Sequence, residues 1–315
     1  MVRRVLLAAP RGFCAGVERA VDTVERALRL YGAPVYVRKQ IVHNKHVVED
    51  LERQGAVFVD TVGEVPHGAT LVFSAHGVSP AVRDAAGARR LNTIDATCPL
   101  VTKVHTQARR YADAGYTIAF VGHAGHEEVE GTMGEAPEAI VLVESADDAR
   151  TVELPADGPL AYITQTTLSI DETRSIIDIL RARYPRIVAP AKEDICYATT
   201  NRQRAVKELL ECVDLLLVIG SKNSSNSVRL VEVARAAGVA AHLVDDAAEI
   251  DERWLDGVDI VGVTSGASAP ERLVRDLCDW FRMRGIDDIS EFSSAFEDVV
   301  FRLPVELRRA QRSAA

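Results

Sequence analysis

Short apolar runs recur along the chain, and they constrain its fold more than any other feature of the sequence. They are rich in β-branched residues and occupy residues 5–9, 70–74, 117–122, 160–164, 214–220 and 259–264. Such runs are typical of strands in parallel sheets that helices cover on both faces. Between them, apolar residues recur at helical spacing, for example over residues 17–28, 101–112 and 230–237. Strands and helices therefore alternate, which predicts an α/β fold.

Composition narrows the class of protein further. A length of 315 residues suits two or three domains of about 100–200 residues each. The net charge of −9, with 26% charged and 47% hydrophobic residues, is typical of a globular chain and does not favour nucleic-acid binding. No apolar run approaches the roughly 18 residues of a membrane span. We therefore expect a cytoplasmic protein that has no nucleic-acid or membrane partner.

Small polar residues follow five of the predicted strands. In α/β sheets, ligands bind outside the carboxyl ends of the strands. Any one cluster is equally explained by a turn or a helix cap, but five together favour a ligand cavity. The clusters are Ser74-Ala-His-Gly, Gly122-His-Ala-Gly-His, Thr164-Gln-Thr-Thr, Gly220-Ser-Lys-Asn-Ser-Ser-Asn-Ser and Thr264-Ser-Gly-Ala-Ser.

Three of the five cysteines share one sequence context. Cys14, Cys98 and Cys196 each stand just before an amphipathic segment, with spacings of 84 and 98 residues. Because helix N-termini stabilise thiolates, each of the three is a candidate ligand or nucleophile. Cys212 and Cys278 lie in apolar stripes instead, and we expect both to be buried as small hydrophobic residues.

The cysteine repeat predicts three comparable units. The N-terminal strand can belong to the sheet of the third unit. The Arg-rich end of the chain after Pro304 is expected to fray. The predicted parts are an α/β unit at 1–97, a second at 98–195, a third at 196–283 and a C-terminal extension at 284–315.

Three widely separated cysteines leave several kinds of site open. The compact Cys-x2-Cys spacing of many metal sites is absent, but a site at the junction of three units takes its ligands from distant segments. Three thiolates suit an iron–sulfur cluster with one open iron, or a zinc ion with a fourth ligand, in a hydrolase or a structural zinc protein. Two other hypotheses are an enzyme with one nucleophilic cysteine activated by a histidine, and a non-catalytic anion-binding module.

Seven motifs together identify a resemblance that spans about residue 3 to about residue 305. Through these motifs and their order along the chain, the sequence resembles the 4-hydroxy-3-methylbut-2-enyl diphosphate reductase family. The motifs are Pro10-Arg-Gly-Phe-Cys-Ala-Gly-Val, Val42-His-Asn, Ser74-Ala-His-Gly-Val-Ser, Asp95-Ala-Thr-Cys-Pro-Leu-Val-Thr-Lys-Val-His, Gln165-Thr-Thr-Leu-Ser, Asp194-Ile-Cys-Tyr-Ala-Thr-Thr-Asn-Arg-Gln and Gly220-Ser-Lys-Asn-Ser-Ser-Asn-Ser.

The resemblance implies an oxidoreductase of the non-mevalonate isoprenoid pathway. In this family, two electrons and two protons remove a hydroxyl group as water, giving isopentenyl and dimethylallyl diphosphates. Cys14, Cys98 and Cys196 match the three ligands of a 4Fe-4S cluster that keeps one iron open to the substrate. The implied fold has three similar parallel-sheet units in a pseudo-threefold arrangement around a central cluster cavity.

The same resemblance assigns roles to polar residues. Glu128 matches the proton donor of the family, and His126 and Thr166 match residues beside the substrate hydroxyl. The family usually has proline where this chain has Glu127, and we expect Glu127 and Glu130 to be solvated or capping groups.

Further matches concern the substrate. The residues that match substrate-binding positions are His43, His76, His126, Thr166, Ser224, Ser225, Asn226 and Ser268. The remaining histidines, for which we expect no site role, are His46, His67, His105, His123 and His242.

Electrons are expected to come from a partner protein. No G-x-G-x-x-G arrangement that follows a strand, typical of nicotinamide and flavin sites, occurs in the sequence. The resemblance implies a ferredoxin or a flavodoxin as the donor.

Overall fold

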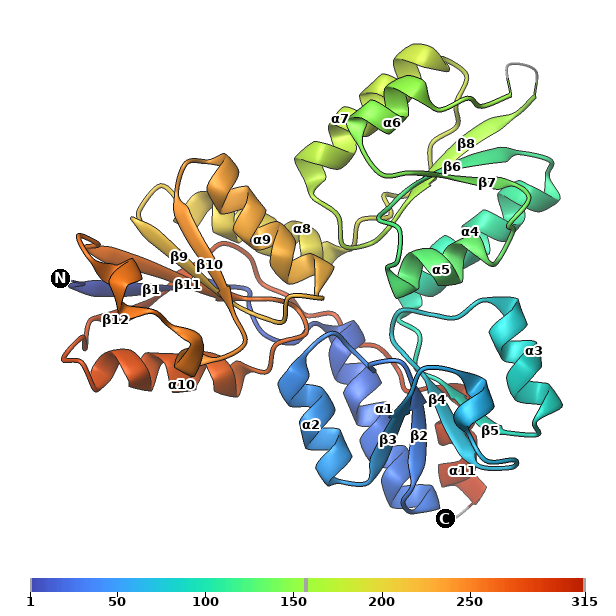
Figure 1. Cartoon of the computed structure of the whole chain (residues 1–315), viewed down its shortest axis with the longest axis horizontal. Coiled ribbons are helices and arrows are strands. Elements are labelled where there is room, and N and C mark those ends of the chain that lie inside the picture. Colours follow the sequence, from blue (N-terminus) through green and yellow to red (C-terminus); the bar gives the residue numbers. More distant parts are fainter. Residues whose placement is uncertain (1, 156–157, 314–315) are drawn as a thin grey trace. The chain divides into compact units, whose positions relative to one another are not determined.

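The computed structural model of the chain describes residues 2–155 and 158–313 (Figure 1). These residues form sheets of five, four and three strands, in which every neighbouring pair is parallel. The predicted α/β class, with three parallel-sheet units, is thereby confirmed. The pseudo-threefold arrangement around a cavity stays a prediction.

The described residues divide into two compact units. Unit 1 comprises the described residues of Met1–Val17, His43–Glu49 and Tyr197–Val300. Unit 2 comprises those of Glu18–Val42, Asp50–Cys196 and Phe301–Ala315. The division at residues 97 and 195, which rests on the cysteine positions, stays a prediction.

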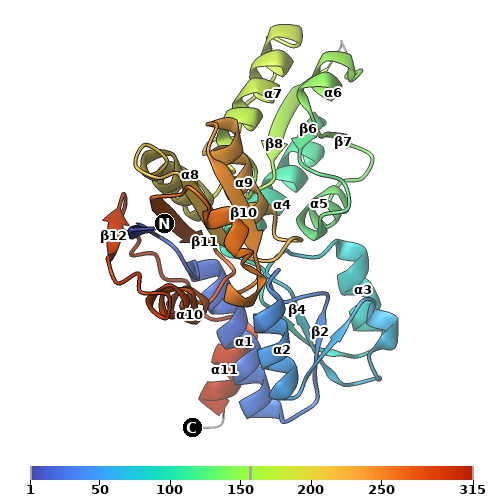
Figure 2. The same cartoon turned by 60° about the vertical axis from the view of Figure 1, so that its left-hand side comes forward.

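Unit 1 contains the five-stranded sheet, whose order is β10-β9-β11-β1-β12. Apolar residues of α8 and α9 pack on one face, and those of α10 pack on the other (Figures 1 and 2). The strands are β1 (Arg4–Ala9), β9 (Leu215–Ile219), β10 (Ala240–Val244), β11 (Ile260–Ser265) and β12 (Ile289–Ser293). The helices are α8 (Tyr197–Leu209), α9 (Ser225–Ala236) and α10 (Glu271–Arg282), with short 3-10 turns η2 (Ala247–Glu249) and η3 (Glu252–Leu255).

Unit 2 contains the other two sheets, and the first of them has the order β3-β2-β4-β5. Helices α1 and α2 begin in unit 1 and continue into unit 2. The strands are β2 (Val35–Arg38), β3 (Ala56–Val59), β4 (Thr70–Phe73) and β5 (Asn92–Asp95). The helices are α1 (Ala15–Tyr31), α2 (Lys45–Arg53), α3 (Pro80–Ala88) and α11 (Val305–Ser313), with the 3-10 turn η1 (Val62–Glu64).

The second sheet of unit 2 has the order β7-β6-β8. Residues of α6 and α7 pack on one face of it, and residues of α4 and α5 pack on the other. The strands are β6 (Thr117–Val121), β7 (Ile140–Val143) and β8 (Leu160–Thr164). The helices are α4 (Pro99–Asp113), α5 (Glu127–Met133), α6 (Ala146–Thr151) and α7 (Ile170–Arg183).

All three sheets repeat one strand order. When β1 is counted after β9, β10 and β11, each sheet has its second strand at one side, followed by the first, the third and a segment in the fourth position, and β12 adds a fifth strand beside β1. The fourth position is taken by β5, by β1, and by an isolated parallel bridge between Val188 and Ala161 of β8. In each sheet, the segment in the fourth position leads directly to one of the three cysteines that precede a helix.

Two expectations meet a different outcome in the structure. Cys212 is exposed, because α8 ends at Leu209 and the apolar stripe ends with it, whereas Cys278 is buried in α10 as predicted. The segment after Pro304, predicted to fray, forms α11 up to Ser313. Residues 314–315 lie outside the described residues.

Helix α11 is anchored by one apolar side chain. Leu307 is 0% exposed, and α11 lies beside α1 in both views (Figures 1 and 2). Among the described residues, no helix has the length and apolar character needed to cross a membrane.

If α11 is packed in this way, shortening Leu307 destabilises the protein. Leu307→Ala is expected to lower the free energy of unfolding by about 2–5 kcal/mol, because it leaves a cavity. Val305 is 42% exposed on the same helix, and Val305→Ala is expected to stay within about 0.5 kcal/mol of the wild type. Urea denaturation of both variants measures this difference. Equal effects of the two substitutions would contradict the packing of α11.

Candidate active site

The three predicted ligand cysteines occupy equivalent positions. Each stands directly before a helix, namely α1, α4 or α8. Each also donates its backbone N–H to a carbonyl two residues beyond the third strand of its sheet. The donor–acceptor pairs are Cys14 to Ala267 (3.1 Å), Cys98 to Ala75 (2.9 Å) and Cys196 to Thr166 (3.0 Å). The strand-end loops that hold the cysteines are those that carry Ser268, His76 and Thr166, three of the predicted site residues.

None of these three cysteines forms a disulfide bond, and all three are partly accessible. Burial raises the pKa of the Cys14 thiol, while the charge of Arg202 and the N–H groups at the start of α1 oppose this rise. Cysteine thiols at equivalent helix starts are soft donors of the kind that hold iron–sulfur or zinc groups. The donor set therefore fits a group held by three thiolates.

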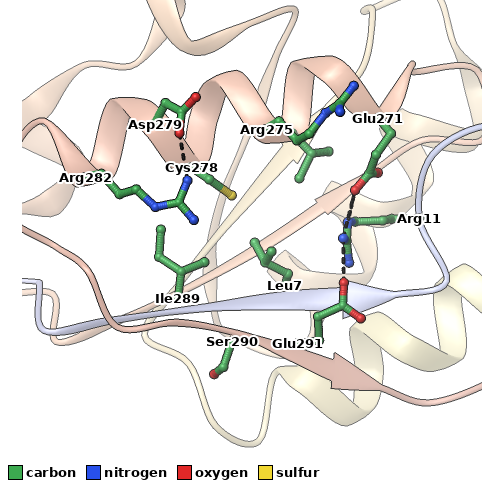
Figure 3. Close-up of a pocket in the computed structure, with 11 residues that line it drawn as sticks. Leu7, Arg11, Glu271, Arg275, Cys278, Asp279, Arg282, Ile289, Ser290 and Glu291 are labelled. Carbon is green, nitrogen blue, oxygen red and sulfur yellow. Dashed lines mark hydrogen bonds and ion pairs between the residues drawn. The ribbon is translucent and has the colours of Figure 1, made fainter.

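The loop before Cys14 is anchored by Arg11. Its guanidinium lies 2.8 Å from a carboxylate oxygen of Glu271 and 2.7 Å from one of Glu291 (Figure 3). These residues line a pocket of about 330 Å³ between α10 and strands β1 and β12. None of the predicted site residues lines this pocket. It is therefore a part of the scaffold that fixes the cysteine loop.

Predicted diphosphate ligands of unit 1 converge where β9 and β11 end. The hydroxyl of Ser268, after β11, donates to the carbonyl of His43 at 2.9 Å and lies 3.4 Å from the hydroxyl of Ser224, after β9. Ser224 is the N-cap of α9, so the backbone N–H groups of Ser225 and Asn226, at the start of this helix, are close by. Hydroxyl groups and a helix N-terminus together form a polar surface that suits an anion.

Asn226 supplies independent support for a ligand here. Asn226 is only 6% exposed, yet both polar atoms of its side-chain amide are buried without a hydrogen-bond partner. The backbone packs tightly around it, since a Cβ on Gly266 would lie 2.9 Å from the amide nitrogen of Asn226. A buried, unsatisfied amide costs about 1–3 kcal/mol, which is typical of a group kept for binding.

In unit 2, the predicted proton donor is buried where β6 and β8 end. Glu128 is 1% exposed, and its carboxylate oxygens accept from the N–H of Thr166 at 2.7 Å and from its hydroxyl at 2.9 Å. Burial raises the pKa of Glu128, and the two hydrogen bonds from Thr166 only partly oppose this rise. Glu128 is thus biased toward its protonated form.

His126 stands at the start of α5 as a neutral ring. Its Nδ1 accepts the backbone N–H of Glu128 at 3.1 Å. Burial, together with the nearby His76 and His123, lowers the pKa of His126 to about 3. A neutral ring that accepts at Nδ1 carries its proton on Nε2. The rings of His126 and His76 meet edge to face, with centroids 5.7 Å apart.

Glu127 differs from its sequence-based interpretation as a solvated or capping group. Its carboxylate lies 3.1 Å from Nδ1 of His76, and both side chains are about 15% exposed. Helix α5 directs Glu127 toward the loop after β4, where His76 lies. Glu130 on the same helix is exposed.

His105 was expected to have no role, but it joins two site loops. It is buried, and its Nδ1 lies 2.7 Å from Glu135, which Arg109 also contacts at 2.7 Å. Its ring occupies the space a Cβ on Gly77 would need, only 2.9 Å away, and it also lies against Gly131 of α5. The sequence gives no signal for this contact, because Glu135 is 30 residues away.

Comparison with known proteins places the chain in a family. The profile of the family described as LytB protein matches residues 5–282. This chain belongs to the LytB family. The family predicted from the seven motifs is thereby confirmed.

Several LytB relatives are similar over nearly the whole chain. A protein of Acidothermus cellulolyticus, named 4-hydroxy-3-methylbut-2-enyl diphosphate reductase, is 60% identical over 98% of this chain and 91% of its own. A protein of Cutibacterium acnes with the same name is 56% identical over 99% of this chain and 97% of its own. The solved E-1-hydroxy-2-methyl-but-2-enyl-4-diphosphate reductase of Plasmodium falciparum matches with a TM-score of 0.97 at 38% identity, covering 100% of this chain and 99% of that one.

The unsatisfied amide of this LytB chain predicts opposite effects on stability and binding. Asn226→Leu is expected to stabilise the ligand-free protein by about 1 kcal/mol or more, because a buried unpaired group is removed. The same change is expected to weaken binding of inorganic diphosphate. Urea denaturation and titration calorimetry measure the two effects, with exposed Asn92→Leu on β5 as the control. Lost stability with unchanged diphosphate binding would contradict the role of Asn226.

Proposed function

We propose that this chain converts 4-hydroxy-3-methylbut-2-enyl diphosphate into isopentenyl diphosphate and dimethylallyl diphosphate by reductive dehydroxylation. The observation that carries the proposal is the recurrence of one cysteine geometry at the ends of three sheets, with the predicted substrate residues on the adjoining loops. The reductase name of relatives up to 60% identical supports it. That name gives no support to a zinc hydrolase or a structural zinc protein.

LytB reductases use an iron–sulfur cluster. For this chain we propose a 4Fe-4S cluster held by Cys14, Cys98 and Cys196, with one iron that has no protein ligand. When bound, the cluster supplies the two electrons of the reaction and a Lewis-acidic iron for the substrate hydroxyl.

The polar cluster of unit 1 binds the diphosphate in this proposal. Ser224, Ser225, Asn226 and Ser268 donate hydrogen bonds to phosphate oxygens, as does His43. Charge-assisted hydrogen bonds contribute about 1.5–3 kcal/mol each. Part of this is offset by the cost of association, about 4–15 kcal/mol. These donors are neutral, so the bound diphosphate keeps its negative charge. That charge disfavours the ionisation of nearby carboxyl groups.

Glu128 delivers a proton to the reacting end of the substrate. The reaction breaks a C–O bond and forms a C–H bond: two electrons enter, one proton leaves with the hydroxyl as water, and one reaches the allylic carbon. Burial keeps Glu128 protonated, and Thr166 fixes its orientation through two hydrogen bonds. His126, neutral with its proton on Nε2, donates a hydrogen bond without adding charge. His76, held by Glu127, lies beside His126 and adds a further polar group.

The two electrons come from outside the chain. We propose a one-electron carrier protein, a ferredoxin or a flavodoxin, as the donor. A chemical reductant substitutes for it in assays.

Cluster ligation by three cysteines predicts that all three are needed together. Substitution of any one of Cys14, Cys98 and Cys196 by serine is expected to abolish turnover of the hydroxylated diphosphate and to lower iron and sulfide content. Cys212→Ser is the matched control, because this thiol is exposed, and it is expected to behave as the wild type. The measurements are iron and acid-labile sulfide per chain after anaerobic reconstitution, and product formation with a chemical reductant.

The outcomes separate the alternatives. Zinc with no sulfide in an active protein would overturn the cluster. A single indispensable cysteine would favour a nucleophilic enzyme.

The proton donor predicts a separable defect. Glu128→Gln is expected to keep its contact with Thr166 and the cluster content, while turnover falls by about 10²–10⁴-fold, the usual contribution of a general acid. Glu130→Gln, on the exposed side of α5, is the control and is expected to be fully active. Near-normal turnover of a cluster-loaded Glu128→Gln variant would contradict the assignment.

A further inference from the structure

Arg19 connects helix α1 to the loop that leads to Cys98. Its Nη1 donates to the carbonyls of Ala96 at 2.9 Å and Thr97 at 3.0 Å, and its Nε donates to the carbonyl of Arg302 at 2.8 Å. Arg19 stands five residues after Cys14. The helix that begins at one cysteine therefore holds the backbone directly before the next.

Lys103 makes the same connection from helix α4. Its ammonium donates to the carbonyls of Lys192 at 2.8 Å and Glu193 at 2.6 Å, and lies 3.0 Å from the carboxylate of Asp194. The side chain of Asp194 is 0% exposed, and it also accepts the N–H of Thr164 at 3.1 Å. Lys103 stands five residues after Cys98, and its partners come two to four residues before Cys196.

Arg202 closes the series from helix α8. It is 0% exposed, and its Nη2 donates to the carbonyl of Gly12 at 2.8 Å, two residues before Cys14. Its Nη1 donates to both carboxylate oxygens of Glu297, at 3.0 and 3.2 Å. Arg202 stands six residues after Cys196, and its Nε is buried without a partner.

The three contacts form one cyclic pattern. The cation after Cys14 holds the loop of Cys98, the cation after Cys98 holds the loop of Cys196, and the cation after Cys196 holds the loop of Cys14. Five or six residues of helix advance about 7.5–9 Å, so each cation lies little more than one helical turn beyond its own cysteine. A positive group also comes close to each thiol loop. The same structural repeat explains all three contacts, although the sequences around the three cations differ.

We propose that Arg19, Lys103 and Arg202 are positioning residues for the three cysteines, each setting the loop of the next cysteine in the cycle. The proposal rests on the proposed function, because it assumes that the three thiols bind one group. Residues around metal ligands orient them, and their loss usually weakens metal binding about 10–100-fold. A positive charge near thiolates also favours the reduced, more negative state of the group they hold.

Lys103 is tested first, because its side chain is 31% exposed and the variant Lys103→Arg keeps a charge opposite the buried Asp194. In anaerobically reconstituted protein, Lys103→Met and Arg19→Met are expected to lose iron to a chelator about 10–100-fold faster than the wild type. They are also expected to have a more negative reduction potential. Lys103→Arg, which keeps a charged donor, is expected to restore both values. For the buried Arg202 the test variant is Arg202→Lys, because removing the positive charge altogether would leave Glu297 unpaired.

Matched controls separate positioning from ordinary structural support. Arg89 and Arg235 also donate from helix ends to single carbonyls, those of Val65 at 2.6 Å and Ala241 at 2.9 Å, but neither carbonyl precedes a cysteine. Arg89→Met and Arg235→Met are expected to keep wild-type iron release and potential. Urea denaturation of the cluster-free proteins is expected to show similar losses of stability for Arg19→Met and Arg89→Met, because both arginines donate to backbone carbonyls.

The outcomes are distinct. Wild-type iron release and potential in Lys103→Met and Arg19→Met would overturn the positioning role, as would equally fast release from Arg89→Met. A wild-type chain that binds no iron and sulfide would overturn the proposed function itself.

Discussion

A backbone hydrogen bond from each of three cysteine N–H groups to the loop beyond a third strand is the interaction on which the rest of this structure depends. In parallel sheets with this strand order, ligands bind where the first and third strands diverge. The polar pairs Ser224 with Ser268, and Glu128 with Thr166, lie at two such points. The hydrogen bonds of Cys14 and Cys196 attach a thiol to each of these pairs. The cysteine loops and the loops that carry the proposed substrate residues are thereby built as one element, repeated in each sheet.

Several residues of the proposed site are buried in ways that lower the stability of the fold. Burial raises the pKa of Glu128, because it disfavours the charged form that most surface glutamates adopt. The amide of Asn226 and the Nε of Arg202 are buried without partners. His126 stays neutral because it is buried near other rings. Each of these features is unfavourable in isolation, and the proposed function gives a reason for the polar ones among them, which is to supply donors and a proton to an anionic substrate.

Much of the fold could be predicted from the sequence, and the errors have physical causes. Strands such as β9 are buried along their whole length and read as apolar runs, whereas β5 and β12 are short, partly exposed and polar, so they carry no such signal. Motif resemblance singled out the cysteines and Glu128 as site residues, and their roles stay predictions. It did not identify Glu127, His105 or the three cations, because their partners are distant in sequence and their contacts arise only when the sheets form.

The central claim is that Cys14, Cys98 and Cys196 hold one inorganic group. Alkylation of the five thiols, read by peptide mass spectrometry before and after anaerobic loading with iron and sulfide, tests it most directly. The account predicts that these three become protected together, in proportion to bound iron, while the exposed Cys212 reacts equally in both samples. Protection of only one or two of the three in fully loaded protein would contradict it.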